Sequence, residues 1–254
     1  FKIRRRKACQ FESGRGHHPL LPHPPSMFNL PPATKALILV CVAMFCIDQF
    51  LPLGPALALW PVDSGRLMPW QPVTYALIHA DLSHLFFNML GIWLFGAEVE
   101  RLWGRNRYLQ FILVSVLTAA AAQLIVTALI GSHAATVGAS GALFGLLLAY
   151  ALVFPRRQFD LVGFLPMLLL MVPSSVINLI GFALFFMLLT NRQAVPIPPL
   201  PIPAMTMVAI YGAIELVLGL FFRTGIAHFA HLGGMLGGWL LIRYWRGRGP
   251  LRRR

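Results

Sequence analysis

Long apolar segments with few charges recur along this 254-residue chain and constrain its fold more than any other feature. A helix that crosses a bilayer needs about 20 mostly apolar residues, and inside lipid its backbone must satisfy its own hydrogen bonds. Only 11% of the residues are charged, against about 25% in soluble domains. The sequence therefore predicts an all-α, multi-pass membrane protein. The candidate spans are 34–52, 82–100, 108–131, 138–154, 204–222 and 228–245.

Positive charge is concentrated at the chain ends and in the connections between apolar segments. The formal net charge is +13, which in a soluble chain would suggest a nucleic-acid partner. The basic clusters lie at 2–7, 101–107, 156–157 and 243–254. The positive-inside rule puts such clusters on the cytoplasmic side. Six spans with both termini in the cytoplasm satisfy all of them. We therefore expect a protein of the cell (inner) membrane, in contact with the lipid bilayer and without a nucleic-acid partner.

An additional apolar stretch at 161–190 has to leave the direction of the later spans unchanged. One more crossing would carry the start of the last span to the cytoplasmic side, away from the start of the fourth. Pro166 and the sequence Pro173-Ser174-Ser175 can break the stretch into two short arms. We therefore predict a hydrophobic hairpin, re-entrant or interfacial, within an additional segment of about 161–200 between the fourth and fifth spans.

The two ends of the chain differ in composition from the apolar part. Residues 1–33 are basic and then rich in His and Pro, which predicts a disordered N-terminal extension. Met27 could be a genuine start, in which case the residues before it would not belong to the mature protein. Residues 34–246 form the predicted membrane domain, and 247–254 a basic cytoplasmic tail. The three cysteines lack the spacing of a disulfide framework or a metal site.

One serine stands among glycines where a loop enters an apolar segment, in the sequence Gly138-Ala139-Ser140-Gly141. A neutral hydroxyl is a weak nucleophile, so Ser140 needs a general base before it can attack a substrate. Histidine is the side chain best suited to that proton transfer near neutral pH. His228 and His231 begin the last apolar segment, which the predicted orientation brings to the same side of the membrane. They are the two candidate bases.

Glycine spacing favours His231 as the base. Gly234 and Gly238 follow it at i+3 and i+7, so the imidazole and both glycines are expected on one helix face. Gly141 and Gly145 repeat the four-residue spacing beside the serine. Small residues at this spacing let membrane helices approach closely, which a Ser–His hydrogen bond requires. Each glycine pair taken alone could equally serve helix packing.

Polar side chains at the start of the second apolar segment could stabilise an oxyanion. His84 and Asn88, at i and i+4, share one helix face and can offer N–H donors, and the backbone N–H of Ser140 could be a third. Such side chains are costly inside a membrane unless they are used. His79 is out of phase with them, so we expect a structural hydrogen bond there. Asp81 is expected to cap the helix.

No carboxylate is evidently placed to orient His231. Asp48 and Glu215 fall in or near the first and fifth spans, and Asp63 falls in a loop. We therefore predict a Ser–His dyad and not a triad. For Glu215, the expectation is a hydrogen bond to a neighbouring helix. Neither a metal nor a cofactor is expected.

These motifs resemble those of bacterial rhomboid intramembrane serine proteases, over most of residues 34–246. The match comprises the segment from His79 to Asn88, the nucleophile motif Gly138–Gly141 and the base motif Ala230–Gly234. The resemblance implies a six-helix bundle that cleaves transmembrane segments of other membrane proteins. It also implies Ser140 as nucleophile, His231 as general base, and His84 and Asn88 at the oxyanion. The chain departs from the family in having Trp70-Gln71 where Trp-Arg is common, and in the additional segment.

Three other functions compete with a protease. A non-proteolytic rhomboid-like protein that binds membrane-protein clients is the main alternative, but it should lack the serine or the histidine. A haem protein could use pairs of the histidines as axial ligands, which would leave Ser140 and the paired glycines without a purpose. A transporter is disfavoured because no internal repeat is evident. The sequence does not define the oligomeric state.

Overall fold

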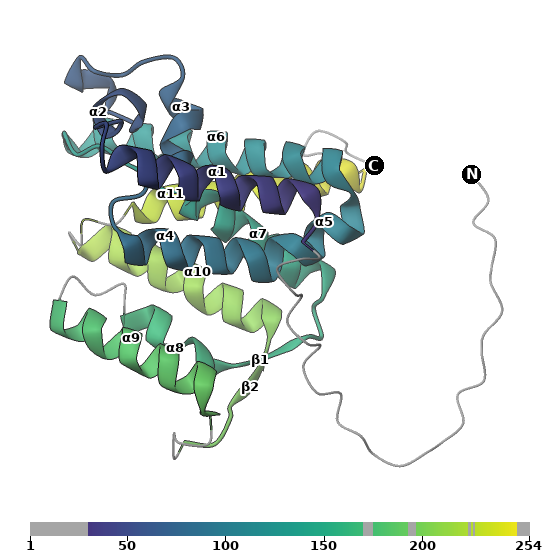
Figure 1. Cartoon of the computed structure of the whole chain (residues 1–254). Coiled ribbons are helices and arrows are strands. Elements are labelled where there is room, and N and C mark those ends of the chain that lie inside the picture. Colours follow the sequence, from purple (N-terminus) through teal and green to yellow (C-terminus); the bar gives the residue numbers. More distant parts are fainter. Residues whose placement is uncertain (1–29, 170–174, 193–196, 223–224, 226, 248–254) are drawn as a thin grey trace, which may run out of the picture.

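The structure is a computed structural model that describes residues 30–169, 175–192, 197–222, 225 and 227–247. This part of the chain is mostly helical, and it contains two three-residue strands, which the sequence analysis did not predict (Figure 1). The elements are α1 (Pro32–Asp48), α2 (Gly54–Leu57), η2 (Val62–Ser64), α3 (Gln71–Thr74), η3 (Tyr75–Leu77), α4 (Leu82–Gly91), η4 (Ile92–Gly96), α5 (Ala97–Trp103), α6 (Arg105–Ile130), α7 (Ser140–Val153), β1 (Gln158–Asp160), α8 (Leu161–Leu169), α9 (Ser175–Thr190), β2 (Pro201–Pro203), α10 (Ala204–Phe221) and α11 (His228–Trp245).

All six predicted spans are helical: α1, the continuous run α4–η4–α5, α6, α7, α10 and α11. Among the described residues, three helical runs are long and apolar enough to cross a membrane, namely Leu82–Trp103, Arg105–Ile130 and Ala204–Phe221. Helix α7 is also apolar but is shorter, at 14 residues. The helical content of the predicted fold is thus present, and the number of membrane crossings stays a prediction.

Helix α1 begins inside the stretch predicted to be disordered, because a carboxylate on another helix caps it. The backbone N–H groups of Ala33 and Thr34 donate to the Glu100 carboxylate at 3.0 and 2.7 Å, and the Thr34 hydroxyl donates to it as well. Pro32 suits a first helical turn, where its missing N–H is not needed. The helix therefore starts two positions before the predicted boundary. Residues 1–29 and most of the predicted tail, 248–254, lie outside the described residues.

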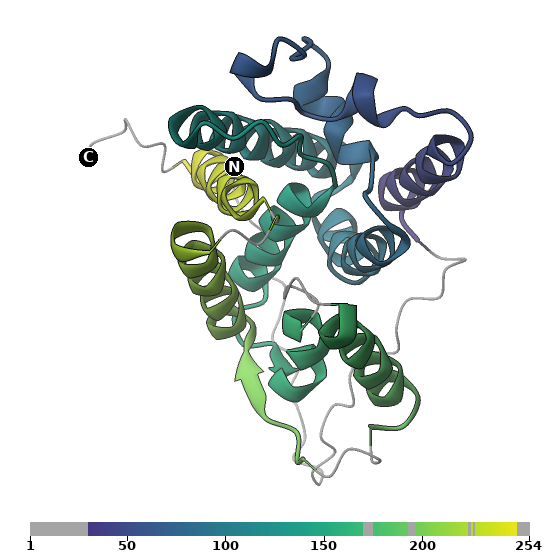
Figure 2. The same ribbon diagram turned by 90° about the vertical axis from the view of Figure 1, so that its left-hand side faces the viewer.

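Helix α11 packs against α6, α7 and α10. Figure 2 views the bundle nearly end-on, with the yellow α11 beside the teal α6 and α7. The glycines of α11 make this packing close: a Cβ at Gly233 or Gly237 would overlap side chains of α6. Small residues permit such contacts between apolar helices. These contacts determine where the first turn of α11 meets the rest of the fold.

The connection between α1 and α4 is held by Gln71, which occupies the position where the resembling family often has arginine. Its side chain is fully buried, and Oε1 accepts hydrogen bonds from the backbone N–H groups of Trp60 and Met68. Its Nε2 donates to the carbonyl oxygens of Ala56 and Arg66. A neutral amide thus satisfies four backbone groups of the loop without a charge. The departure from Trp-Arg is therefore accommodated structurally.

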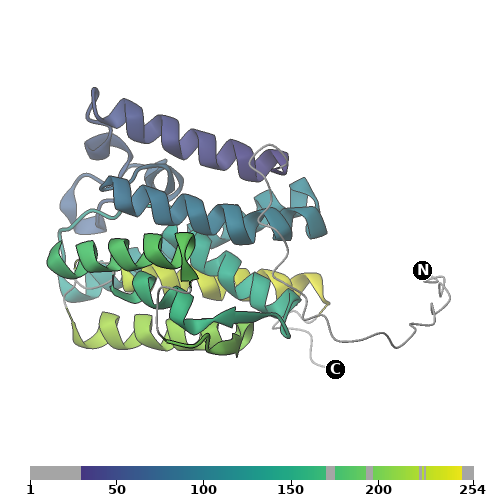
Figure 3. The same cartoon turned by 60° about the horizontal axis from the view of Figure 1, so that its bottom comes forward.

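The additional segment between the fourth and fifth predicted spans forms two helical arms, α8 and α9 (Figure 3). Strands β1 and β2 pair antiparallel at its two ends, with Phe159 opposite Ile202. No alternation of apolar and polar residues predicts these strands, because β2 is Pro201-Ile202-Pro203. The predicted break at Pro173-Ser174 lies outside the described residues. Whether the arms enter a membrane stays a prediction.

An ion pair reinforces the closure of this segment. The Asp160 carboxylate accepts a hydrogen bond from Arg192 Nε at 2.8 Å and another from the backbone N–H of Leu200. Burial raises the pKa of Asp160, but the hydrogen bonds, led by that from Arg192, lower it more, so the net pKa lies below its usual value. Asp160, at the start of the additional segment, is therefore bonded to Arg192 and Leu200 near its end.

The two arms contact different walls of the bundle. From α9, Phe182 and Phe185 pack on Phe87 of α4, with ring centroids 5.3 Å apart in both pairs. On the other side, the hydroxyl of Tyr211 in α10 donates to the carbonyl oxygen of Phe164 in α8 at 3.3 Å. Helices α8 and α9 together thus bridge α4 and α10.

Candidate active site

Ser140 is the first residue of α7, and the backbone before it adopts a conformation that favours glycine. Gly138 has φ of 115°, in the left-handed region that residues with a Cβ disfavour. A Cβ there would also lie 2.5 Å from His84 Cε1, so glycine lets the imidazole approach the loop. The N–H of Ser140 belongs to the first helical turn, whose donors have no intrahelical acceptor. The serine thus stands beside available backbone donors.

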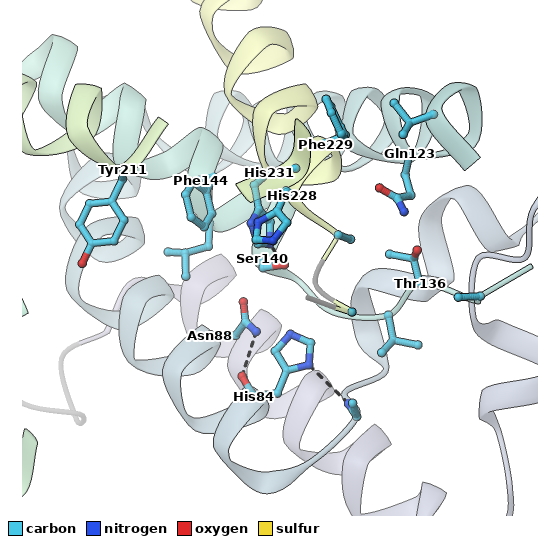
Figure 4. A pocket seen from close by; sticks show the side chains of 18 of the residues that line it. His84, Asn88, Gln123, Thr136, Ser140, Phe144, Tyr211, His228, Phe229 and His231 are labelled. Carbon is cyan, nitrogen blue, oxygen red and sulfur yellow. Dashed lines mark hydrogen bonds between the residues drawn. The ribbon is translucent and has the colours of Figure 1, made fainter. Parts of the chain in front are cut away.

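His231 contacts the serine directly. Its Nε2 lies 2.8 Å from Ser140 Oγ (Figure 4). The ring of Phe144, one turn after the serine, stacks on the imidazole with centroids 4.3 Å apart and an interplanar angle of 4°. The imidazole is therefore held between the serine and an aromatic plane.

The close approach of α7 and α11 depends on glycines. A Cβ at Gly234 would overlap the carbonyl oxygen of Gly141, and one at Gly145 would come within 3.0 Å of the carbonyl oxygen of Gly234. Gly238 differs from the expectation, since a Cβ there would meet Phe111 of α6 and not α7. The reason is that α11 is enclosed by both helices, so glycines seven residues apart need not face the same one. Gly141 and Gly234 therefore set the separation of the two helices that carry Ser140 and His231.

His84 and Asn88 of α4 lie near Ser140, as Figure 4 shows. His84 Nδ1 accepts from the N–H of Ala80 at 3.5 Å, which leaves Nε2 to carry the proton on the side of Gly138. Asn88 Nδ2 donates one hydrogen to the carbonyl oxygen of His84 at 2.9 Å and keeps a second hydrogen. Asn88 Oδ1 is buried without a hydrogen-bond partner among the described residues. Two N–H donors therefore remain on the side of the serine.

The start of α4 follows the expected cap, and the buried His79 packs beside it. The Asp81 side chain accepts from the N–H of His84 at 2.8 Å, which confirms the predicted N-cap. His79 is buried, and neither ring nitrogen has a hydrogen-bond partner in the part of the chain described. Its ring packs edge-on against His84, 5.1 Å between centroids. Burial, together with His84, lowers the pKa of His79 to about 4, so it stays neutral. His79 supports His84 by packing.

A carboxylate reaches His231, contrary to the sequence analysis. Glu215 of α10 is fully buried, and its Oε2 lies 2.9 Å from His231 Nδ1. The same oxygen lies 2.6 Å from Nδ1 of His228, the other candidate base. Glu215 lies about two-thirds of the way along α10 and the histidines begin α11, and the packing of these two helices side by side brings the three residues together. The packing of α10 on α11 is a tertiary feature, which the spacing along each helix alone does not give.

Glu215, His228 and His231 could each offer one atom to a metal ion, since those atoms lie within 4.8 Å of one another. Their polar atoms, however, already face one another and the serine. His231 Nε2 is at Ser140 Oγ, and both Nδ1 atoms are at the carboxylate. The carboxylate, the two imidazoles and the serine hydroxyl thus lie in one chain of polar contacts through which protons can be shared.

A cavity of about 960 Å³ gives access to the serine and the histidine. It is lined by residues of α4, α6, α7, α10 and α11 and of the loop before Ser140. Apolar side chains form much of its wall on the hairpin side, including Phe87, Phe164 and Met207. Such a wall suits an apolar ligand. A hydroxyl, a base and N–H donors within one cavity can support acyl transfer.

Comparison with known proteins gives the same family as the motifs. A family model described as Rhomboid domain matches residues 66–184 and 173–248. Rhomboid protease GlpG of Klebsiella pneumoniae is 32% identical over 92 residues, covering 35% of this chain and 33% of the relative. For rhomboid protease GluP of Bacillus subtilis the identity is 35% over 92 residues, or 35% of this chain and 17% of the relative.

A longer match extends over part of another relative. GlpG of Photorhabdus laumondii is 27% identical over 150 residues, covering 56% of this chain and 51% of that protein. The chain thus spans about half or less of the length of these curated relatives.

Proposed function

The chain belongs to the rhomboid family, and we propose that it is a serine endopeptidase that cleaves transmembrane segments of other membrane proteins. The observation that carries the proposal is the 2.8 Å distance between Ser140 Oγ and His231 Nε2, in a cavity enclosed by apolar helices. Ser140 is the nucleophile and His231 the general base. A short hydroxyl–imidazole contact is what nucleophilic catalysis by serine needs.

The reaction follows from the positions of these groups. His231 Nε2 takes the proton of Ser140 as Oγ attacks the scissile carbonyl carbon, and a tetrahedral oxyanion forms. His84, Asn88 and the backbone N–H of Ser140 stabilise that oxyanion. His231 then gives the proton to the leaving amine, which completes the acyl-enzyme. Water activated by His231 releases the acyl group and restores the serine.

The substrate in this proposal is a membrane helix that reaches the cavity sideways, near α4 and α10. The scissile amide must leave its helix before Ser140 can attack it, so helix-destabilising residues such as Gly near the cut are favoured. The hairpin α8–α9 contacts both α4 and α10, so an entering helix has to pass or displace it. The hairpin is therefore the element that limits access from this side.

The arrangement in the membrane belongs to the same proposal. The domain 34–246 then crosses the inner membrane of the cell six times, with both termini in the cytoplasm. This topology puts the start of α7 and of α11 near the outer surface. Water then reaches Ser140 from outside. The basic clusters that follow α5 and α7 and end the chain support this orientation.

Reconstitution with a substrate tests the function directly. The full chain is placed in liposomes with a single-span membrane protein that carries Gly and Ala in its span. We expect cleavage within that span, stopped by a serine-directed fluorophosphonate and unaffected by a metal chelator. Binding of the substrate without cleavage would favour the client-binding alternative and refute the protease. Cleavage stopped only by the chelator would refute the serine mechanism.

Replacing Asn88 by alanine is expected to lower kcat about 10²-fold, because an oxyanion donor is removed. Asn88→Asp keeps the size of the side chain but exchanges the N–H donor for an acceptor, so it should be as inactive as the alanine variant. The measurement is the initial rate of substrate cleavage in liposomes, corrected for folded protein. An aspartate variant with wild-type kcat would show that Asn88 serves packing and not the oxyanion.

A further inference from the structure

The buried carboxylate of Glu215 lies on the side of His231 that faces away from Ser140, and it has no role in the reaction proposed above. Glu215 lies in α10, an apolar helix long enough to cross a membrane, and is 0% exposed. A carboxylate at such a position is costly unless it is paired. Its contacts run through Oε2, which lies 2.6 Å from His228 Nδ1 and 2.9 Å from His231 Nδ1. Oε1 has no hydrogen-bond partner among the described residues.

The contact with Ser140 determines which tautomer of His231 the reaction needs. The Ser140 hydroxyl has to donate to His231 Nε2, so that nitrogen carries no proton. A neutral imidazole has one N–H, which then sits on Nδ1 and faces Glu215 Oε2. A carboxylate at this position selects the reactive tautomer and stabilises the imidazolium that forms when the serine loses its proton.

We propose that Glu215 is a positioning residue for the Ser140–His231 pair and that His228 holds its carboxylate in place. The site is then a serine–histidine–glutamate triad and not a dyad. Glu215 acts through His231 and does not touch the substrate. This inference rests on the proposed function, because it assigns a role within the same reaction.

The surroundings of His231 leave Glu215 as the carboxylate that can fill this role. Helix α7 contains no charged residue, and the only charged residues of α6, Arg105 and Arg107, lie in its first turn. Of the other titratable groups near the imidazole, His228, His84 and Tyr211 are not acids that ionise at neutral pH. Asp81 lines the same cavity, but its carboxylate accepts hydrogen bonds from the Ser83 hydroxyl and the N–H of His84 at the start of α4. The charge that complements an imidazolium therefore comes from α10.

The test separates catalysis from folding with two carboxylate-to-amide variants. Glu215→Gln is expected to lower kcat about 10²- to 10⁴-fold with KM within about twofold, because charge and tautomer control are lost. Glu215→Asp, which keeps the carboxylate, should recover part of the loss. The matched control is Glu100→Gln, which alters the buried carboxylate that caps α1. It should lower the melting temperature while kcat per folded molecule stays at the wild-type value.

Each result decides the inference. The inference is overturned if the wild type is active and Glu215→Gln has the same kcat. It is also overturned if the activity lost in Glu215→Gln is explained entirely by a smaller amount of folded protein. If a chelator activates the wild type but not Glu215→Gln, then Glu215, His228 and His231 bind a metal ion that blocks the base. That result would also overturn the inference. Failure of the proposed function has a different signature, since the wild type itself would then cleave nothing.

Discussion

Replacing Ser140 or His231 by alanine is expected to lower substrate cleavage about 10⁶-fold, and the double variant is expected to be no worse. The reason is that the two side chains act as one unit: without the imidazole at 2.8 Å the hydroxyl stays protonated, and without the hydroxyl the imidazole has nothing to activate. What remains is catalysis by the oxyanion donors and by binding. The measurement is the single-turnover rate in liposomes for the wild type, the two single variants and the double variant.

Matched substitutions outside the site control for this experiment. Ser64 ends the short helix η2 and His133 lies in the loop after α6, and the hydroxyl of Ser64 makes hydrogen bonds within its own turn. Ser64→Ala and His133→Ala should keep the wild-type rate. Equal cleavage by the wild type, Ser140→Ala and His231→Ala would remove the protease interpretation altogether. Additive losses in the double variant would show that the two residues do not work together.

Replacing Gly234 by valine is expected to abolish most of the activity by separating α7 from α11. A Cβ at this position overlaps the carbonyl oxygen of Gly141, which is backbone and cannot rotate away. The helices must move apart, and a displacement of about 1 Å at a catalytic pair can cost about 10²-fold in rate. We therefore expect a loss of more than roughly 10²-fold, with a stability loss of about 1–3 kcal/mol from overpacking. Cleavage rates and thermal unfolding of the same sample measure both effects.

Gly212→Ala is the control for added volume at a helix contact. Its new Cβ would lie 3.4 Å from Met235 Cε, the end of a flexible side chain. Activity and stability should stay close to the wild-type values. A Gly234→Val variant that is as active as Gly212→Ala would contradict the view that close packing of these helices sets the Ser140–His231 distance.

The proximity of Ser140 and His231 could be predicted from sequence because independent constraints agree. The basic clusters fix the direction of each predicted span, which brings the start of α7 and of α11 to one side. Glycines beside each residue then indicate that the two helices can touch. The N-cap at Asp81 followed in the same way from a local rule. Such features depend on short stretches of chain, so the sequence defines them.

Features that depend on how distant elements pack could not be predicted. Glu215 reaches His231 because α10 packs against α11, so its partner is known only when both helices are placed. Gly238 shares a helix face with His231 but contacts α6, because α11 is enclosed on several sides. The pairing of β1 with β2 likewise joins residues that no local pattern links. Tertiary packing, and not propensity, decides each of these.

The position of a covalent adduct tests the central claim most directly. The wild-type chain in liposomes is treated with a serine-directed fluorophosphonate, and the modified peptide is identified by mass spectrometry. We predict one adduct on Ser140 oxygen that is absent from Ser140→Ala and forms at a greatly reduced rate in His231→Ala. An adduct that forms on another residue, or equally fast without the His231 imidazole, would contradict the account.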